Sequence, residues 1–580
     1  MSNHHPSPTT NESPWRFLDQ QIQTLNAKLF SGLSPISLAL AQMDWALNLM
    51  QTPSAQIELQ QQLAKDWSHW MLNALPFKAT TDSNASGQVD NRFTHSSWNN
   101  QPWASLVQAQ QLQEKWWQQA TQLRGMRPHS QEQMRFYASK WLDMASPSNW
   151  LMTNPEATEK ALQTGGLSLA KGAQQAFHDW WQAHGHPANG DKPSLSPGHG
   201  LAMTPGEVVA RQHLCELIQY APSTRQVHAE PVLIIPSCIM KYYILDLSPE
   251  NSMVKWLVSQ GHTVYMVSWR NPDENDALLT MDDYVREGVL NCLSHVQQAH
   301  QEKVHLMGYC LGGTFAAMAA AHLEGQTRAR QQAGLASLTL LAAETDFSEP
   351  GEMGVLIDEA QVRMLEDMMA AQGFLTGKQM AGSFQFLHAR DLVWSNRTKR
   401  WLLGDEDIPN DLMIWNADLT RLPAVMHSQY LRQCFLHNDL AHGQFSFNGD
   451  TLVLRDIALP TFAVGTVKDH VSPWRSVYKL HQLISGPVTF ALTNGGHNAG
   501  IISEPGHHGR HFQMHTTPAH APRLTSDEWQ MVAAQQEGSW WTAWHEWLVA
   551  HGSGRQVAAR QPPKNASLGA APGAYVMTRY

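Results

Sequence analysis

The sequence predicts an α/β fold with an inserted cap, preceded by a mostly helical N-terminal domain. In the C-terminal two thirds of the chain, short apolar runs rich in β-branched residues alternate with helical stretches, which is typical of a parallel sheet covered on both faces. Before that region, apolar residues recur at three- and four-residue steps, which indicates amphipathic helices. A glycine-rich turn, Gly308-Tyr309-Cys310-Leu311-Gly312, joins one apolar run to an alanine-rich helix.

The composition limits the architecture and the partners. With 580 residues the chain is too long for one ordinary core, so we expect more than one domain. The formal net charge of -10 argues against nucleic acid as the main partner, because phosphate binding needs a basic surface. The five widely spaced cysteines do not form a disulfide framework. The polar N-terminus lacks the apolar core of a signal peptide, and no apolar run reaches the roughly 18 residues of a membrane helix. We therefore expect a soluble cytoplasmic protein.

Composition shifts along the chain predict the domain boundaries. Residues 1–13 are polar and are predicted to be a disordered tail. Residues 14–200 form the predicted helical N-terminal domain, with a turn-rich linker at 184–200. Residues 201–580 form the predicted α/β domain, with the cap inserted at about 345–450. An insertion there is expected over the strand ends, where open α/β sheets bind ligands.

Six apolar runs are the predicted strands of the sheet. They span 230–237, 262–269, 303–309, 336–344, 460–466 and 487–492. Helical periodicity separates most of them, as at 251–259 and 282–300. The long stretch between the fourth and fifth runs mixes helix and loop, and it supplies the predicted cap.

The glycine-rich turn makes Cys310 a candidate nucleophile. It fits the pattern G-x-S-x-G with cysteine in place of serine, on a strand-to-helix turn that lifts the nucleophile above the sheet. This motif in this context predicts an α/β-hydrolase fold. The alternative is a buried structural cysteine, but the strand before Cys310 and the helix after it favour a nucleophile.

Asp469 and His497 are the candidate acid and base. In this fold the acid and then the histidine follow the nucleophile along the chain. Asp469 follows the fifth apolar run and His497 follows the sixth, so both are expected at the same sheet edge as Cys310. His470 is a weaker candidate for the base because it does not follow a strand of its own. The alternative is that Asp469 and His497 are ordinary loop residues.

Backbone N–H groups are expected to stabilise the oxyanion of an acyl intermediate. One is the N–H of Leu311, directly after the nucleophile, and the second comes from the loop after the first run, where we assign it to Ile239. Cys238 in that loop is expected to be a small packing residue. No metal or cofactor is expected, since the spacing of a late group of histidines fits no zinc pattern. That group comprises His507, His508, His511, His515 and His520.

The choice of cysteine over serine favours acyl transfer. A cysteine acylated by a CoA thioester forms another thioester, so the exchange is nearly neutral and the acyl group stays activated for attack by a hydroxyl. Free cysteine has a pKa of about 8.5, so a base is needed to form the thiolate, and His497 would supply it. The argument leaves a cysteine hydrolase open as an alternative.

Matching stretches along the chain resemble the polyhydroxyalkanoate (polyhydroxybutyrate) synthases, the polymerases that make bacterial storage polyester. They include "GYCLGGT" (308–314), "WNADLTRLPAVMH" (415–427), "KDHVSPW" (468–474) and "GGHNAG" (495–500). The upstream segment 32–56 is similar to an extra N-terminal segment of one branch, and the chain resembles the single-subunit class I type. The resemblance implies polymerisation of 3-hydroxyacyl-CoA, with 3-hydroxybutyryl-CoA as the expected monomer, and release of CoA.

The resemblance also implies roles for single residues. Cys310 would carry the growing chain as a thioester, His497 would be its base, and Asp469 would help to activate the 3-hydroxyl of the attacking acyl group. His470 and Trp415 match family positions around the site. The resemblance further implies homodimers bound to the surface of polyester granules in the cytoplasm, with the CoA thioester as substrate and no separate cofactor.

Two positions depart from the family pattern. Met240 stands where the family usually has asparagine, and Asn498 stands where isoleucine is common. Two other function classes remain as alternatives to a polymerase. A cysteine-triad hydrolase acting on an ester or lactone explains Cys310, Asp469 and His497, but not the long helical N-terminus. A non-catalytic granule-binding or regulatory protein explains the resemblance, but not the intact set of reactive residues.

The N-terminal region is rich in tryptophan, which allows two interpretations. The whole chain has 23 tryptophans, and Trp45, Trp67 and Trp70 lie in the first predicted helices. They either form an aromatic helical core or present an amphipathic surface to an apolar partner, since tryptophan combines an apolar body with a polar N–H.

Overall fold

The chain divides into two compact units. Unit 1 consists of Met1–Pro35, Leu195–Met380 and Asp411–Tyr580, and unit 2 consists of Ile36–Ser194 and Ala381–Asn410. The structure is a computed structural model that describes residues 15–30, 32–74, 90–184, 195–327, 334–387, 389–406 and 410–579. The predicted tail and most of the predicted linker lie outside these described residues.

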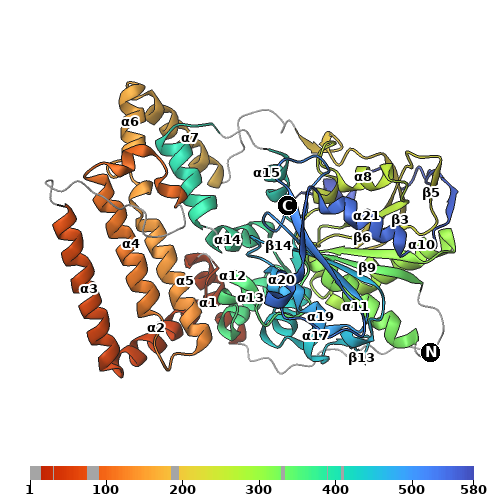
Figure 1. The fold of residues 1–580 in the computed structure, drawn as a ribbon, viewed down its shortest axis with the longest axis horizontal. Coiled ribbons are helices and arrows are strands. Elements are labelled where there is room, and N and C mark those ends of the chain that lie inside the picture. Colours follow the sequence, from red (N-terminus) through yellow and green to blue (C-terminus); the bar gives the residue numbers. More distant parts are fainter. Residues whose placement is uncertain are drawn as a thin grey trace. The chain divides into compact units, whose positions relative to one another are not determined.

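Unit 1 is built on a ten-stranded sheet (Figure 1). Its six central strands are parallel and lie in the order β7, β6, β8, β9, β14, β15. Their bounds are Val264–Trp269 (β7), Val232–Ile235 (β6), Val304–Tyr309 (β8), Leu335–Leu341 (β9), Thr461–Thr466 (β14) and Val488–Thr493 (β15). All six strands predicted from the apolar runs are confirmed. Nearly every residue in them is buried, as expected for parallel strands between two helical layers.

Antiparallel strands extend the sheet at both edges. On one side, β4 pairs with β7 and β3 pairs with β4; on the other, β16 pairs with β15 and β17 pairs with β16. Their bounds are Gly206–Arg211 (β3), Cys215–Tyr220 (β4), His511–Thr517 (β16) and Ala534–Glu537 (β17). The sequence patterns did not predict these four strands. Two of the late histidines, His511 and His515, are therefore strand residues.

Helices cover the sheet. The helix α8 (Met253–Ser259) and the helical run Met281–His300 confirm the predictions for 251–259 and 282–300. The helix α21 (Trp540–Ala550) lies beside α8 on one face, where the rings of Trp256 and Trp541 are 5.6 Å apart, and α11 (Leu311–Thr327) covers the other face (Figure 1). The buried tryptophans of α21 fill the core against the strands.

The cap is the insertion between β9 and β14. Its helices in unit 1 include α12 (Gly351–Leu356), α13 (Glu359–Ala370), α15 (Asp411–Asn416), α16 (Ala424–Gln429) and α17 (Asp439–His442). The N-terminal helix α1 (Arg16–Leu29) also belongs to unit 1. The chain just after α1 is fastened to α13 by one amide: Gln361 accepts from the N–H of Ser34 and donates to the carbonyl of Gly32, both at 2.7 Å.

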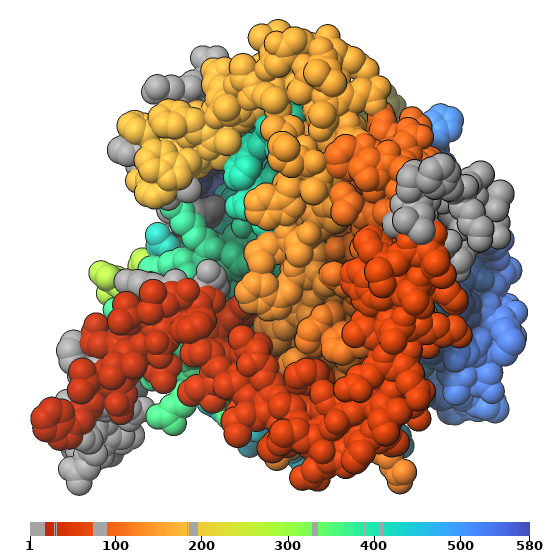
Figure 2. Space-filling model, turned by 90° about the vertical axis from the view of Figure 1, so that its left-hand side faces the viewer, coloured from red at the N-terminus to blue at the C-terminus, as the bar shows by residue number. Residues whose placement is uncertain are grey.

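Unit 2 is helical, and its residues form most of the orange and yellow surface seen in Figure 2. Its helices are α2 (Pro35–Met50), α3 (Pro53–Ala74), α4 (Trp103–Ala120), α5 (Pro128–Ala145), α6 (Pro155–Gln163) and α7 (Leu167–Ala183), with the π-helices η7 (Ala389–Ser395) and η8 (Thr398–Leu402) from the second segment. Among the described residues, the helical character predicted for the N-terminal region is confirmed. No helix in the described ranges is long and apolar enough to cross a membrane.

Two of the N-terminal tryptophans pack inside unit 2. The indole N–H of Trp45 on α2 donates to the carbonyl of Ala120 at 2.8 Å, and that of Trp70 on α3 donates to Ser105 at 2.7 Å. Both acceptors lie on α4. These two side chains therefore fasten α2 and α3 to α4, as the core interpretation predicts.

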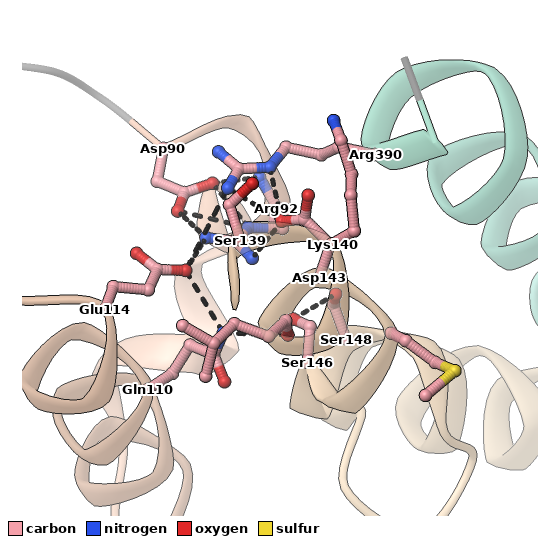
Figure 3. A network of polar contacts seen from close by, with 12 residues as sticks. Asp90, Arg92, Gln110, Glu114, Ser139, Lys140, Asp143, Ser146, Ser148 and Arg390 are labelled. Atoms are coloured by element: carbon pink, nitrogen blue, oxygen red, sulfur yellow. Dashed lines mark hydrogen bonds and ion pairs between the residues drawn. The ribbon is translucent and has the colours of Figure 1, made fainter. Parts of the chain in front are cut away.

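A polar network ties the two segments of unit 2 together (Figure 3). Arg92 is almost completely buried, and its guanidinium lies 2.6 Å from Asp90 and 2.8 Å from Glu114. Burial acts to lower the pKa of Arg92, but its hydrogen bonds to these carboxylates raise that pKa above its ordinary value. The buried carboxylate of Asp143 lies 3.4 Å from Arg92 and 2.7 Å from Arg390, which comes from η7. The segment 381–410 is thereby held to the helices by a charge-assisted contact.

Candidate active site

Cys310 lies on a sharp turn between β8 and α11. Its φ of 52° is in the left-handed region, which residues other than glycine rarely adopt. Its N–H donates to the carbonyl of Leu341 at 2.9 Å, which ties the turn to β9. Cys310 is partly exposed, whereas the other four cysteines are buried. This is the geometry of a nucleophile elbow.

Two glycines make the turn sterically possible. A Cβ on Gly308 would lie 2.4 Å from the Cα of Gly313, and a Cβ on Gly312 would lie 2.3 Å from the carbonyl oxygen of Pro236. Both distances are well inside van der Waals contact, so a larger residue does not fit at either position. The close approach of Gly312 to Pro236 also brings the N-terminus of α11 beside the loop that follows β6.

Asp469 and His497 lie in the loops after β14 and β15 and contact each other. Nδ1 of His497 is 2.8 Å from Oδ2 of Asp469. The second oxygen of Asp469 accepts from the backbone N–H groups of Val471 at 2.9 Å and Ser472 at 2.8 Å. The carboxylate is therefore fixed by its own loop, and it in turn fixes the imidazole.

The pKa of His497 depends on the neighbouring charge of Cys310. Burial acts to lower the pKa of His497. The charges of Asp469 and Cys310, together with hydrogen bonds to both side chains, act in the opposite direction and raise that pKa well above its ordinary value. Because Nδ1 is taken by Asp469, Nε2 is the ring nitrogen left for the Cys310 thiol. The structure thus brings together the three residues that the sequence predicts as nucleophile, base and acid.

The two predicted oxyanion donors belong to adjacent segments. Leu311 is the first residue of α11, where the N–H groups of the first turn have no acceptor within the helix. Ile239 lies on the loop after β6, and its N–H donates to the hydroxyl of Ser237 at 3.3 Å. The carbonyl of Ile239 accepts from the N–H of Thr420 at 3.1 Å. The loop is thus held on its far side by the segment that follows α15.

Trp415 braces the same loop. It is almost completely buried, and its indole N–H donates to the carbonyl of Lys241 at 2.7 Å. Met240 forms a β-bridge with Leu419 a few residues further along. The segment that begins at Trp415 therefore runs along the loop after β6 and fixes the backbone of that loop.

His470 is placed apart from the other site residues. Its side chain is 60% exposed, and its Nδ1 lies 4.0 Å from Glu352. Its backbone carbonyl accepts from the N–H of Glu352 at 3.4 Å. The structure therefore brings Asp469 to His497 but turns the neighbouring His470 toward the surface.

Sequence reasoning missed a buried carboxyl beside the site. Glu344, three residues after β9, is buried, and its Oε1 has no hydrogen-bond partner among the described residues. Burial raises the pKa of Glu344 well above its ordinary value, and the charges of Asp469 and Cys310 act in the same direction. Its position at a strand end is the one sequence signal that could have pointed to it.

The fold defines the class of this protein: an α/β-hydrolase-fold enzyme, with Cys310 on the turn between β8 and α11. A family model described as alpha/beta hydrolase fold matches residues 231–503. The model of the Poly-beta-hydroxybutyrate polymerase (PhaC) N-terminus matches residues 89–257, and that of the Poly-beta-hydroxybutyrate polymerase N terminal region matches residues 13–54.

Several curated proteins are similar over most of the chain. The Poly(3-hydroxyalkanoate) polymerase of Methylorubrum extorquens is 36% identical over 92% of this chain and 88% of its own. The Poly(3-hydroxyalkanoate) polymerase subunit PhaC of Cupriavidus necator is 36% identical over 78% of this chain and 76% of its own. A solved structure, the monoacylglycerol lipase of Paleococcus ferrophilus, is 12% identical, with a TM-score of 0.33 over 58% of this chain and 99% of its own. The chain belongs to the poly(3-hydroxyalkanoate) polymerase family, and it is an acyltransferase.

Proposed function

We propose that this polymerase builds its polyester on Cys310 from 3-hydroxyacyl-CoA, with 3-hydroxybutyryl-CoA as the expected monomer. The observation that carries the proposal is Cys310 on its left-handed turn beside His497, whose pKa the Cys310 charge helps to raise and whose ring Asp469 holds. The Cys310 thiolate attacks the thioester carbonyl of the substrate, and the bond to CoA breaks. The acyl group is then a thioester on Cys310, and CoA leaves as a thiolate that takes up a proton.

Chain growth is an attack by a 3-hydroxyl on that thioester. The hydroxyl loses its proton, its oxygen bonds to the thioester carbonyl, and the cysteine sulfur leaves. A thioester is thereby replaced by an oxyester, which makes the step downhill. The N–H groups of Leu311 and Ile239 would stabilise the oxyanion in both steps. The hydroxyl of Ser237 now accepts from Ile239, so the substrate oxygen would have to replace it.

His497 is the proposed base for the thiol. For Asp469 the family resemblance implies help in activating the 3-hydroxyl, and its hydrogen bond to Nδ1 of His497 also supports an orienting role. Trp415 would act at a distance by holding the backbone at Lys241, beside the oxyanion loop. Membership of the polymerase family over most of the chain argues against the cysteine hydrolase.

We also propose that the enzyme forms homodimers and works in the cytoplasm on the surface of polyester granules. An exposed apolar face on α2 supports attachment to such a surface. It consists of four side chains at three- and four-residue steps: Leu40 (58% exposed), Met43 (60%), Leu47 (47%) and Met50 (66%). We call this set the α2 apolar face.

The direct test is to give the purified protein 3-hydroxyacyl-CoAs of several acyl lengths and to follow CoA release and polymer together. Stoichiometric CoA release with polymer supports the proposal. Release of CoA with free 3-hydroxy acid and no polymer would instead support a hydrolase.

A further inference from the structure

A hydrogen bond joins the residue before the proposed nucleophile to the residue after the proposed base. Tyr309 is the last residue of β8, directly before Cys310, and its hydroxyl donates to Oδ1 of Asn498 at 2.7 Å. Asn498 directly follows His497. The nucleophile turn and the histidine loop are thus tied together one residue away from each reacting side chain.

The environment of Tyr309 makes this bond a strong constraint. Tyr309 is almost completely buried, and its ring lies 5.7 Å from the ring of His497, tilted by 36°. Burial raises the pKa of Tyr309 well above its ordinary value, so the hydroxyl keeps its proton and acts as a donor. A buried hydroxyl that loses its partner is unfavourable, so the two loops resist moving apart.

The other end of the Asn498 amide reaches the cap. Its Nδ2 donates to Oδ1 of Asn416 at 3.4 Å. Asn416 ends α15 and directly follows Trp415, which holds the backbone beside the oxyanion loop. One amide therefore lies between the nucleophile turn, the histidine loop and the segment that braces the oxyanion side.

We propose that Asn498 is a positioning residue that acts through Tyr309 to hold His497 within proton-transfer reach of the Cys310 thiol. Proton transfer needs a heavy-atom separation of about 2.6–3.2 Å, so a small shift between the two loops changes how much thiolate forms. Asn498 itself touches no reacting atom. The inference rests on the proposed roles of Cys310 and His497.

Two substitutions remove the bond with little change of volume. Tyr309→Phe deletes one oxygen atom, and Asn498→Leu replaces the amide by an apolar group of similar size. The matched control is Tyr265→Phe. Tyr265 lies on β7 in the same sheet, two strands away from β8; it is equally buried, and its hydroxyl lies 2.8 Å from Nε2 of His300. The control therefore loses a buried hydroxyl contact away from the site.

The readout is the rate at which iodoacetamide alkylates Cys310, measured from pH 6 to pH 9 with the site assigned by peptide mass spectrometry. This rate reports the thiolate and needs no substrate. The titratable groups Asp469, Glu344, Cys238 and Tyr430, whose charges act on this pair, are the same in every variant. We expect each single variant to slow alkylation at pH 7 by about three- to tenfold. The double variant should be no slower than the slower single variant, and Tyr265→Phe should match the wild type.

Steady-state kinetics provide the second readout. With 3-hydroxybutyryl-CoA, kcat should fall by a similar factor while KM changes less than about twofold, because the amide does not bind substrate. An unchanged alkylation profile in Tyr309→Phe, additive effects in the double variant, or an equal loss in Tyr265→Phe would each overturn the inference. If Asn498→Leu is insoluble, Tyr309→Phe alone decides. Failure of the proposed function can be told apart from failure of this inference, because only the former would appear as polymer synthesis by Cys310→Ala.

Discussion

Nδ1 of His497 and Oδ2 of Asp469 lie 2.8 Å apart, beyond the ends of two neighbouring parallel strands. The strands β14 and β15 pair in register up to Thr466 and Thr493. Asp469 follows the first of these residues by three positions, and His497 follows the second by four. Because the two strands end in register, Asp469 and His497 lie at the same edge of the sheet, close enough for their side chains to contact each other.

Replacing Cys310 with alanine should abolish CoA release, because no other thiol stands on the nucleophile turn and the remaining four cysteines are buried. Cys310→Ser should leave at most traces of activity, since its oxyester stores less transfer potential than a thioester. Colorimetric detection of free CoA, with polymer measured in parallel, checks both variants. Substantial polymer from Cys310→Ala would remove Cys310 from the mechanism.

Asp469→Asn and His497→Gln should differ in the size of the first burst of CoA in a single-turnover assay. If His497 deprotonates Cys310, its loss slows the first acylation by roughly a hundredfold or more. If Asp469 mainly serves the 3-hydroxyl, its loss spares the first burst of CoA and blocks elongation. Equal loss of the burst in both variants would mean that Asp469 acts by orienting His497, as in an ordinary triad.

Replacing Glu344 with glutamine should stabilise the protein at neutral pH. Burial raises the pKa of Glu344 well above its ordinary value of about 4.5, so the unfolded chain releases a proton that the folded chain keeps. This group therefore stabilises the fold fully below about pH 4.5, and its contribution is lost as pH rises toward the folded pKa. Glu344→Gln removes this loss, so we expect the variant to be more stable than the wild type at pH 8.

Thermal midpoints at pH 5 and pH 8 check this expectation. The gain from Glu344→Gln should be larger at pH 8, and substitution of the exposed Glu537 by glutamine is the matched control. A gain of the same size at both pH values, or a less stable variant at pH 8, would show that the carboxyl is ionised in the fold.

A buried histidine should make the fold sensitive to acid. His305 on β8 is buried beside Ser337, and burial lowers the pKa of His305 to about 4. The unfolded chain takes up a proton below about pH 6.5, whereas the folded chain does so only near pH 4. Stability is therefore complete above pH 6.5 and falls by up to about 3 kcal/mol between pH 6.5 and pH 4.

The thermal midpoint followed from pH 7.5 to pH 5 measures this dependence. His305→Gln should flatten it, even if the variant is less stable throughout. The slope should decrease rather than vanish, because burial lowers the pKa values of His427 and His481 to about 4 as well. The exposed His470→Gln is the control, and a slope that is unchanged in His305→Gln would contradict the prediction.

Substituting the α2 apolar face with glutamine should weaken attachment to granules. Each side chain contributes roughly 1.5 kcal/mol or more when buried against an apolar surface, so four together should lower the partition coefficient at least tenfold. The backbone helix is kept, since glutamine is a good helix former. Sedimentation with isolated granules measures the partition, and light scattering measures the mass in solution.

The control for this experiment is a second exposed apolar pair in unit 2, Met152 and Leu162, which are 83% and 80% exposed. Their replacement by glutamine should leave both partition and mass unchanged. If neither changes when the α2 apolar face is replaced, that face contacts neither the granule nor a second copy of the chain.

The buried parts of the fold could be predicted from the sequence because burial leaves a strong local signal. The six central strands are continuous apolar runs, and the Gly308-x-Cys310-x-Gly312 turn needs small residues wherever a strand turns sharply into a helix. The order of nucleophile, acid and histidine then follows from the fold. These features depend on short stretches of chain, so one sequence is enough to find them.

The missed features depend on partners that are distant in the sequence. The antiparallel strand β16 mixes polar and apolar residues, and its histidines gave no strand signal before the pairing with β15 was known. The hydrogen bond between Tyr309 and Asn498 joins residues 189 positions apart, and neither residue type predicts this contact. Glu344 is unusual only because of what surrounds it, and surroundings are a property of the folded chain.

The ion pair between Arg390 and Asp143 has a consequence for how the protein is made. These residues are 247 positions apart, and the helices up to α7 leave the ribosome well before residues 381–410 do. In that interval the buried carboxylate of Asp143 lacks one of its two arginines, and the surface that 381–410 later covers within unit 2 stays open. We expect the nascent helical unit to remain incomplete until synthesis passes about residue 410, which exposes it to chaperones and to misassembly for that time. A separately expressed fragment of residues 36–194 should stay in that unfinished state.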